Sequence, residues 1–183
     1  KHGQLWLVTE DKGLLCIKGN SIKQYFLSAD EKASIKDGDI CEDKKGNIYV
    51  GTNGMGLWKL NNGAKQFVLI KPTAKMPIKD LYIDHQGNVL LGCDGIGLYV
   101  YYPNTGQLSA NPFYSNDISL PKTKIQTIVE DRNGNIWLGM MQKGVFMQPA
   151  KRRNFEYMGP KLGTFNYIGT NCVTSIIQDT RRR

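Results

Sequence analysis

The stretch that decides the fold of this chain is Glu130-Asp131-Arg132-Asn133-Gly134-Asn135-Ile136-Trp137-Leu138-Gly139. Asp131 can accept a hydrogen bond from the backbone two residues on, and Gly134 can adopt the positive φ that closes a tight turn. Apolar and β-branched residues stand on both sides of the turn, and these suit paired strands. The stretch therefore predicts a hairpin with its turn at 131–134.

The same pattern occurs four times in the 183 residues. Each turn glycine is followed ten residues later by a second glycine and an apolar pair. The glycine pairs are Gly3 with Gly13, Gly46 with Gly56, Gly87 with Gly97, and Gly134 with Gly144. The turn glycines are 43, 41 and 47 residues apart, which is the kind of fixed period expected of a repeat protein. Val173, Ile176 and Asp179 begin a fifth copy.

Each repeat predicts four short strands, which in the last complete copy cover 125–130, 135–140, 145–148 and a stretch near 155–158. The second strand is apolar at consecutive positions, Ile136-Trp137-Leu138, so both faces of the sheet should be buried. Four-stranded units of about 40–45 residues are typical of propeller blades. We predict an all-β fold of β-propeller blades, about four repeats of four antiparallel strands, forming an arc of a larger propeller. A closed four-bladed ring and an open stack of sheets are the alternatives.

The chain is therefore predicted to be a single propeller region over 1–183. Its repeats cover approximately 1–35, 36–77, 78–123 and 124–171, and 172–183 start a further repeat.

Composition narrows the functional classes. No apolar run approaches the ~20 residues needed to cross a bilayer. The net charge of +8 permits an anionic partner, but the lysines are scattered and form no nucleic-acid motif, so we predict that this region binds no nucleic acid. The four cysteines are Cys16, Cys41, Cys93 and Cys172. None is in a C-x-x-C spacing, so they predict neither a zinc site nor a dithiol redox motif.

The pattern D-x-x-G-N, followed by apolar residues and a glycine, resembles the two-component regulator propeller repeat. The best copies are 131–146, 43–58 and 84–99, and the resemblance covers nearly the whole chain. The family often has Trp-Ile-Gly-Thr in its second strand, where this chain has Trp137-Leu138-Gly139-Met140. Such repeats build the extracytoplasmic sensor regions of hybrid two-component histidine kinases, with which glycan-degrading gut bacteria detect oligosaccharides.

The resemblance implies a periplasmic location, as the extracytoplasmic part of an inner-membrane protein. It also implies further propeller blades or domains of the same polypeptide, a homodimer in the full sensor, and a kinase that lies outside this chain. These implications are expectations about a larger protein.

Strand order predicts where a ligand would bind. The first-to-second and third-to-fourth turns lie on one face of the blades, the turn face, and their residues are explained by turn chemistry. The second-to-third loops and the blade connections lie on the opposite face, the loop face, and variable loops on a rigid scaffold suit recognition. The candidate ligand-binding residues are Asn53, Asp94, Tyr114, Lys122, Lys143 and Tyr167. Aromatic rings can stack on sugars, and lysines can bind acidic groups, so we expect an oligosaccharide ligand, an acidic one if the lysine excess is used.

We predict no catalytic residues, no metal site and no cofactor. A propeller hydrolase needs paired carboxylates or a histidine base. Asp94 and Glu10 are the only acids at second-strand loop positions, and His85 lies in a repeated turn. The chain is therefore predicted not to be an enzyme, with a polysaccharide lyase or glycosidase as the less favoured alternative. A protein-interaction scaffold is the other alternative, and an exposed apolar patch over ~400 Å² would favour it.

Overall fold

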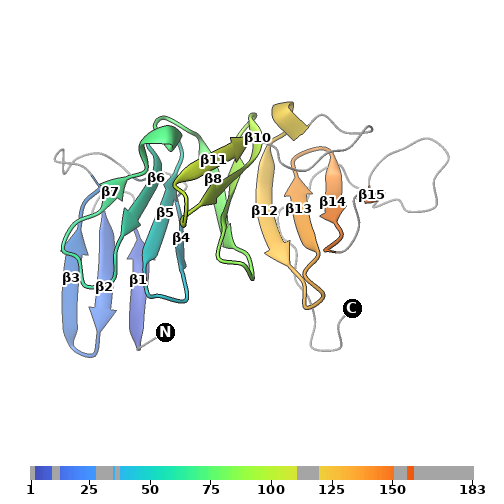
Figure 1. Ribbon diagram of the computed structural model, residues 1–183. Coiled ribbons are helices and arrows are strands. Elements are labelled where there is room, and N and C mark those ends of the chain that lie inside the picture. The colour runs from blue at the N-terminus through green and yellow to red at the C-terminus, as the bar shows by residue number, and fades with distance from the viewer. Residues whose placement is uncertain are drawn as a thin grey trace.

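The computed structural model describes residues 3–9, 13–27, 35, 38–110, 120–150 and 156–158. These residues form four antiparallel sheets that stand side by side in chain order (Figure 1). The first sheet consists of β1 (Gln4–Val8), β2 (Leu14–Lys18) and β3 (Ser21–Tyr25). The second consists of β4 (Asp39–Glu42), β5 (Ile48–Thr52), β6 (Gly56–Leu60) and β7 (Val68–Leu69).

The third sheet consists of β8 (Ile78–Ile83), β9 (Val89–Cys93), β10 (Gly97–Tyr102) and β11 (Gln107–Ala110). The fourth consists of β12 (Ile125–Glu130), β13 (Ile136–Met140), β14 (Gly144–Gln148) and β15 (Glu156–Met158). Two short 3-10 helices, η1 (Lys71–Thr73) and η2 (Leu120–Lys122), lie in the connections between sheets, at the upper side of the view in Figure 1. Among the described residues no helix is both long and apolar enough to cross a bilayer.

The predicted fold class is confirmed: the chain is all-β and its sheets form a partial propeller. The four strands predicted for the last complete repeat are present within one residue of their expected limits. Neighbouring sheets meet mainly through their first strands, with β8 packed between β4 and β12. At the end of the arc, Leu5 and Leu7 of β1 are 56% and 40% exposed.

The middle strands bury both of their faces, as the consecutive apolar residues predict. All five residues of β9 are buried. Leu90 packs in a core cluster with Leu138 of the fourth sheet. Val89 and Leu91 point the other way, into a cluster with Tyr49 of the second sheet. Since each fully buried apolar side chain contributes about 1.5–3 kcal/mol, stacking the sheets provides most of the core.

A glycine in the second strand of the second and third repeats lets the next sheet approach closely. A Cβ on Gly51 of β5 would lie 2.6 Å from Cγ2 of Ile78, and a Cβ on Gly92 of β9 would lie 2.9 Å from Cγ2 of Ile125. Ile78 and Ile125 are the first residues of the neighbouring inner strands and are fully buried. The repeated glycine is therefore needed for contact between blades.

The turn motif is held by side-chain bonds within the turn. Asp131 Oδ1 accepts the backbone N–H groups of Asn133 and Asn135 at 2.8 and 3.0 Å. Its Oδ2 accepts Asn135 Nδ2 at 2.7 Å and Trp137 Nε1 at 3.0 Å. Asn135 Oδ1 in turn accepts the backbone N–H of Ala150, which joins this turn to the segment after β14. The D-x-x-G-N motif thus has a structural role.

The equivalent turns of the second and third sheets repeat these bonds. Asp43 and Asp84 each accept the same two backbone N–H groups and the side-chain amide of the asparagine after the glycine, at 2.7–2.9 Å. The glycines Gly46, Gly87 and Gly134 have φ of 81°, 88° and 80°. These positive values explain why glycine occupies the third position after the aspartate in each turn.

Candidate functional site

The loop face carries four of the six residues predicted to bind a ligand. The four are Asn53, Asp94, Lys122 and Lys143, which lie in second-to-third loops or in the connection that contains η2. Tyr114 and Tyr167 lie outside the described residues.

Backbone hydrogen bonds tie these loops to the connections between sheets. Asn53 pairs with Pro77 in an isolated β-bridge, and the Pro77 carbonyl accepts the N–H of Asp94 at 2.8 Å. One sheet further on, the N–H of Met141 donates to the carbonyl of Lys124 at 2.9 Å. Each connection therefore holds loops of the loop face in place, which gives that face a defined backbone.

Three lysines lie in or against the connection 120–124 on this face, and one of them is paired with a carboxylate. Lys124 Nζ lies 3.0 Å from Asp94 Oδ1, and the two side chains are 51% and 29% exposed. Lys143 Nζ donates to Thr123 Oγ1 at 3.1 Å, while Lys122, at the end of η2, is exposed. We call Lys122, Lys124 and Lys143 the lysine cluster. Asp94, which was predicted from its loop position, is paired with Lys124 of the cluster, a partner that the sequence did not indicate.

Two half-buried acids on the inner strands, Asp39 and Asp80, were not predicted from the sequence. Asp39 Oδ2 accepts the N–H of Leu81 in the next sheet at 2.8 Å, and Asp80 Oδ2 accepts the N–H of Ile128 at 2.6 Å. Burial raises the pKa of Asp39. Burial and the charge of Asp39 raise the pKa of Asp80 to about 7. Both carboxylates bond to backbone of a neighbouring blade, which explains them as links between blades.

Burial also raises the pKa values of the cysteine thiols. Cys93 is fully buried, and burial raises its pKa to about 12. Burial raises the pKa of Cys16 and Cys41 as well, and all three thiols are free. Neutral thiols in such surroundings behave as small apolar side chains. Among the described residues, no three His, Cys, Asp or Glu side chains are grouped in a way that could hold a metal ion.

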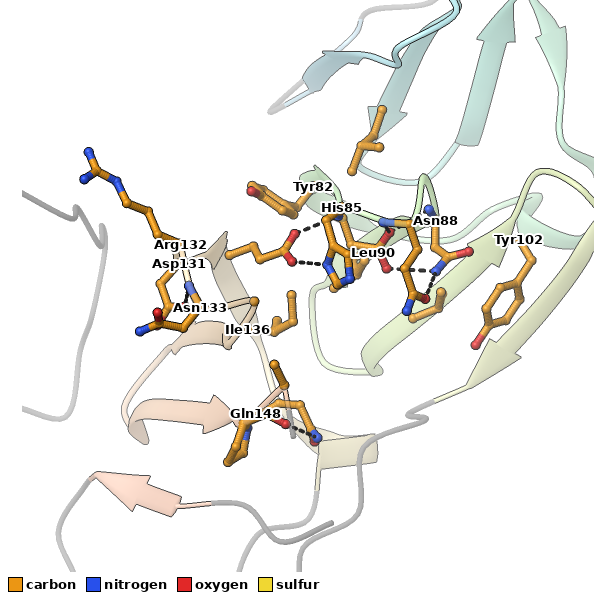
Figure 2. Close-up of a pocket in the computed structure, with 18 of the residues that line it drawn as sticks. Tyr82, His85, Asn88, Leu90, Tyr102, Asp131, Arg132, Asn133, Ile136 and Gln148 are labelled. Atoms are coloured by element: carbon orange, nitrogen blue, oxygen red, sulfur yellow. Dashed lines mark hydrogen bonds and ion pairs between the residues drawn. The ribbon is translucent and has the colours of Figure 1, made fainter. Parts of the chain in front are cut away.

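A large cleft opens on the turn face between the third and fourth sheets (Figure 2). We call it the interblade cleft, and its volume is about 930 Å³. Its lining includes Tyr82, His85 and Tyr102 from the third sheet and Arg132 and Asn133 from the fourth. Volumes of ~300–1,000 Å³ are typical of small-molecule sites.

The sequence analysis assigned this face to scaffold and did not predict the cleft. The sequence nevertheless contained an indication of the cleft, at the two variable positions of the D-x-x-G turns. These positions hold Lys44-Lys45, His85-Gln86 and Arg132-Asn133 in the three complete repeats. Side chains that differ between otherwise constant turns are free to contact other groups, and His85, Arg132 and Asn133 all line the cleft.

Two segments of the chain, 33–54 and 119–142, match the family model described as the two component regulator propeller. They contain the turns at Asp43 and Asp131, so the resemblance drawn from the turn motif is confirmed. A search of curated protein sequences found no significant match.

Solved propeller structures share this fold. Two extracellular domains of proposed hybrid two-component systems from Bacteroides thetaiotaomicron superpose with TM-scores of 0.76 and 0.74, at 19% and 20% identity. In both cases 98% of this chain is covered, against 24% and 23% of the solved chains. An ancestral GH74 enzyme superposes with a TM-score of 0.63 at 17% identity, covering 91% of this chain and 24% of its own. The chain thus spans about a quarter of the length of these structures.

Proposed function

We propose that this chain is part of the ligand-sensing extracytoplasmic region of a hybrid two-component sensor. In this proposal it lies in the periplasm, detects an oligosaccharide and relays the signal to a kinase outside the chain. Further blades of the same polypeptide complete the propeller, and the full sensor is a homodimer. The repeats of the regulator family and the likeness to the extracellular domains of two such systems support this function.

The lysine cluster is the observation that supports an acidic ligand. Three ammonium groups lie on one stretch of the loop face, and Asp94 neutralises only one of them through its contact with Lys124. A sugar carboxylate or sulfate could accept charge-assisted hydrogen bonds from Lys122 and Lys143, and such bonds are roughly twice as strong as neutral ones. The ligand is therefore an acidic oligosaccharide.

Ligand binding at this face would affect how the blades are arranged relative to one another. The connection 120–124 accepts the N–H of Met141 from the fourth sheet and, through the Thr123 carbonyl, the N–H of Gly97 from the third. A ligand held by this connection contacts backbone that joins two sheets. Signalling then needs a difference in ligand affinity between two arrangements of the propeller or its partner domains.

The double variant Lys122→Gln/Lys143→Gln tests the proposal. We expect its affinity for uronic-acid oligosaccharides to fall by about tenfold or more, because two charged donors are lost. Glutamine keeps a donor for Thr123, so the fold should be retained. Isothermal titration of the intact sensor with matched acidic and neutral oligosaccharides measures the effect.

The matched control is Lys45→Gln/Lys65→Gln, which removes the same charge from two exposed lysines outside the loop face. Its affinity for the acidic oligosaccharides should stay within about twofold of wild type, because exposed charges far from a ligand are screened. Equal heat from acidic and neutral sugars, or no heat from either, would rule out the acidic ligand.

A glycosidase is the second candidate, and the likeness to a GH74 enzyme is the observation that favours it. At 17% identity this likeness concerns the fold. The paired acids Asp39 and Asp80 both accept backbone N–H groups of neighbouring strands, which accounts for them without catalysis. Incubating the sensor with the oligosaccharide panel should therefore release no cleavage products, and product formation would favour the enzyme.

A further inference from the structure

The interblade cleft is wide because of two side chains, and its equivalent one blade earlier is narrow. The corresponding cleft between the second and third sheets has about 220 Å³, against about 930 Å³. In the narrow cleft Tyr49 and Lys59 are both lining residues, with Lys59 Nζ 5.5 Å from the Tyr49 ring centroid. The same repeat positions in the wide cleft hold Leu90 and Val100. These smaller residues are 1% and 4% exposed and lie at the buried floor of the wider cleft.

The walls of the interblade cleft combine apolar and aromatic surface with polar groups at the rim. Leu90, Val100 and Ile136 supply the apolar part. Tyr82 and Tyr102 are half-buried against the core and line the same space (Figure 2). Tyrosine rings beside aliphatic groups suit a ligand with a flat apolar face, such as a pyranose ring.

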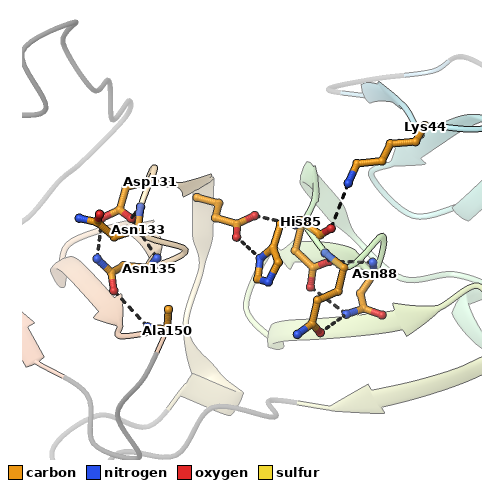
Figure 3. Close-up of polar contacts among 10 residues, drawn as sticks. Lys44, His85, Asn88, Asp131, Asn133, Asn135 and Ala150 are labelled. Carbon is orange, nitrogen blue, oxygen red and sulfur yellow. Dashed lines mark hydrogen bonds and ion pairs between the residues drawn. The ribbon is translucent and has the colours of Figure 1, made fainter.

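The carboxylates that line the cleft are already bonded to protein donors. Asp84 and Asp131 hold their own turns. Glu130, whose side chain is 7% exposed, accepts the backbone N–H of His85 at 2.8 Å and also contacts the ring Nδ1 of His85. Lys44 Nζ donates to the His85 carbonyl at 3.1 Å, so three blades are linked at this point (Figure 3). The three carboxylates of the cleft are therefore already hydrogen-bonded within the protein.

The groups exposed at the rim are mainly donors. His85 is 62% exposed and its Nε2 is not the atom that contacts Glu130. Arg132 and Asn133 are exposed on the facing turn. Sugar hydroxyl oxygens accept bonds from such groups. Three carboxylates and two cations line the cleft, so its charge does not favour an anionic unit.

We propose that the interblade cleft is a second binding site, which takes an uncharged saccharide unit. This proposal rests on the proposed function only for the broad ligand class, because the cleft lies on the opposite face from the lysine cluster and does not favour an anionic ligand. One sugar ring packs on Tyr82 or Tyr102, and its hydroxyl oxygens accept bonds from Arg132 and Asn133. A sugar hydroxyl donates to Nε2 of His85, because Nδ1 of that ring carries the proton shared with Glu130. The sensor thereby distinguishes neutral from acidic units at separate places.

The test uses the full chain with maltose, cellobiose and lactose as neutral probes and a galacturonate disaccharide as the acidic one. Saturation-transfer NMR and titration calorimetry measure binding. We expect at least one neutral disaccharide to bind with a Kd on the order of 1 mM, since few donors and one stacked ring are involved. The variant Leu90→Tyr/Val100→Lys, which copies the pair of the narrow cleft, should lose this binding.

A second variant, Asn133→Ala, should weaken binding of the neutral probe about threefold to tenfold, because one hydrogen bond is lost. Lys45→Ala is the matched control and should bind as wild type: Lys45 holds the same position in the turn two repeats earlier and does not line the cleft. Should the filled variant not fold, Asn133→Ala decides the question.

Two results would overturn the proposal. One is that no neutral disaccharide binds. The other is that binding survives unchanged in the folded cleft-filling variant or in Asn133→Ala. The lysine-cluster variant Lys122→Gln/Lys143→Gln separates the two sites: it should leave the neutral probe unaffected. Acidic binding that depends on those lysines would stand even if the cleft proposal failed.

Discussion

Replacing Gly56 by alanine should lower the free energy of unfolding by about 2–4 kcal/mol, the largest effect that we expect from a single methyl group in this chain. Gly56 has φ +79°, and a Cβ there would lie 2.3 Å from the carbonyl oxygen of Thr73. Thr73 cannot easily move, because it is fully buried and its Oγ1 accepts the N–H of Leu57 at 2.8 Å and donates to Ile70. The connection between two blades would be displaced. Urea denaturation, read as a shift of the midpoint at constant slope, measures the loss.

Gly95→Ala is the control that separates the cost of backbone strain from the cost of a steric clash with the neighbouring connection. Gly95 has φ +80°, close to that of Gly56, but a Cβ there would meet nothing within 4 Å. The free energy of unfolding of this alanine variant should therefore fall by only about 1 kcal/mol, which is the cost of the positive φ. Equal losses in the two variants would show that the contact with the connection has no energetic importance.

Asp80→Asn should raise the stability of the protein at pH 8 by on the order of 2 kcal/mol and should flatten its dependence on pH. The pKa of Asp80 is raised from 3.8 to about 7 by burial and by the charge of Asp39. Between about pH 4 and pH 7 the folded state holds a proton that the unfolded state has lost. The free energy of unfolding should thus fall as pH rises through this window, and the full penalty applies above it. Thermal or urea unfolding at pH 4.5, 6 and 8 measures the trend.

Asparagine preserves the acceptor that Asp80 presents to the N–H of Ile128, so the bond between blades is kept. Asp39→Asn removes the neighbouring charge that raises the pKa of Asp80, and should shift the window to lower pH without abolishing it. A wild-type protein whose stability rises steadily from pH 4.5 to pH 8, with no change in Asp80→Asn, would contradict this account.

The sequence alone was sufficient for the fold because the fold depends on what the repeats share. The turn at Asp131 and Gly134 and the consecutive apolar residues of β13 are local patterns, and local turn chemistry and burial determine what they form. The sequence also shows that the glycine of β5 recurs in other repeats. Its role, which is to let Ile78 approach, becomes clear only from the way in which two blades stack.

The sites were harder to predict because they depend on how the repeats differ. Asp94 and Lys143 were predicted from their loop positions, but the partner of Asp94, Lys124, comes from the next connection. The interblade cleft depends on Leu90 and Val100 being smaller than their counterparts in the preceding blade. A comparison of side-chain size at equivalent repeat positions would have indicated the cleft, whereas the motif search considered only what was constant.

The central claim is that the loop face of these blades binds an acidic oligosaccharide. Hydrogen exchange of the intact sensor, with and without a saturating uronic-acid tetrasaccharide, tests it most directly. The account predicts slower exchange in 120–124 and 140–144, where the amides of Thr123 and Met141 donate to Leu120 and Lys124. Binding of the tetrasaccharide with unchanged exchange in both segments, or with protection confined to the turn face, would contradict it.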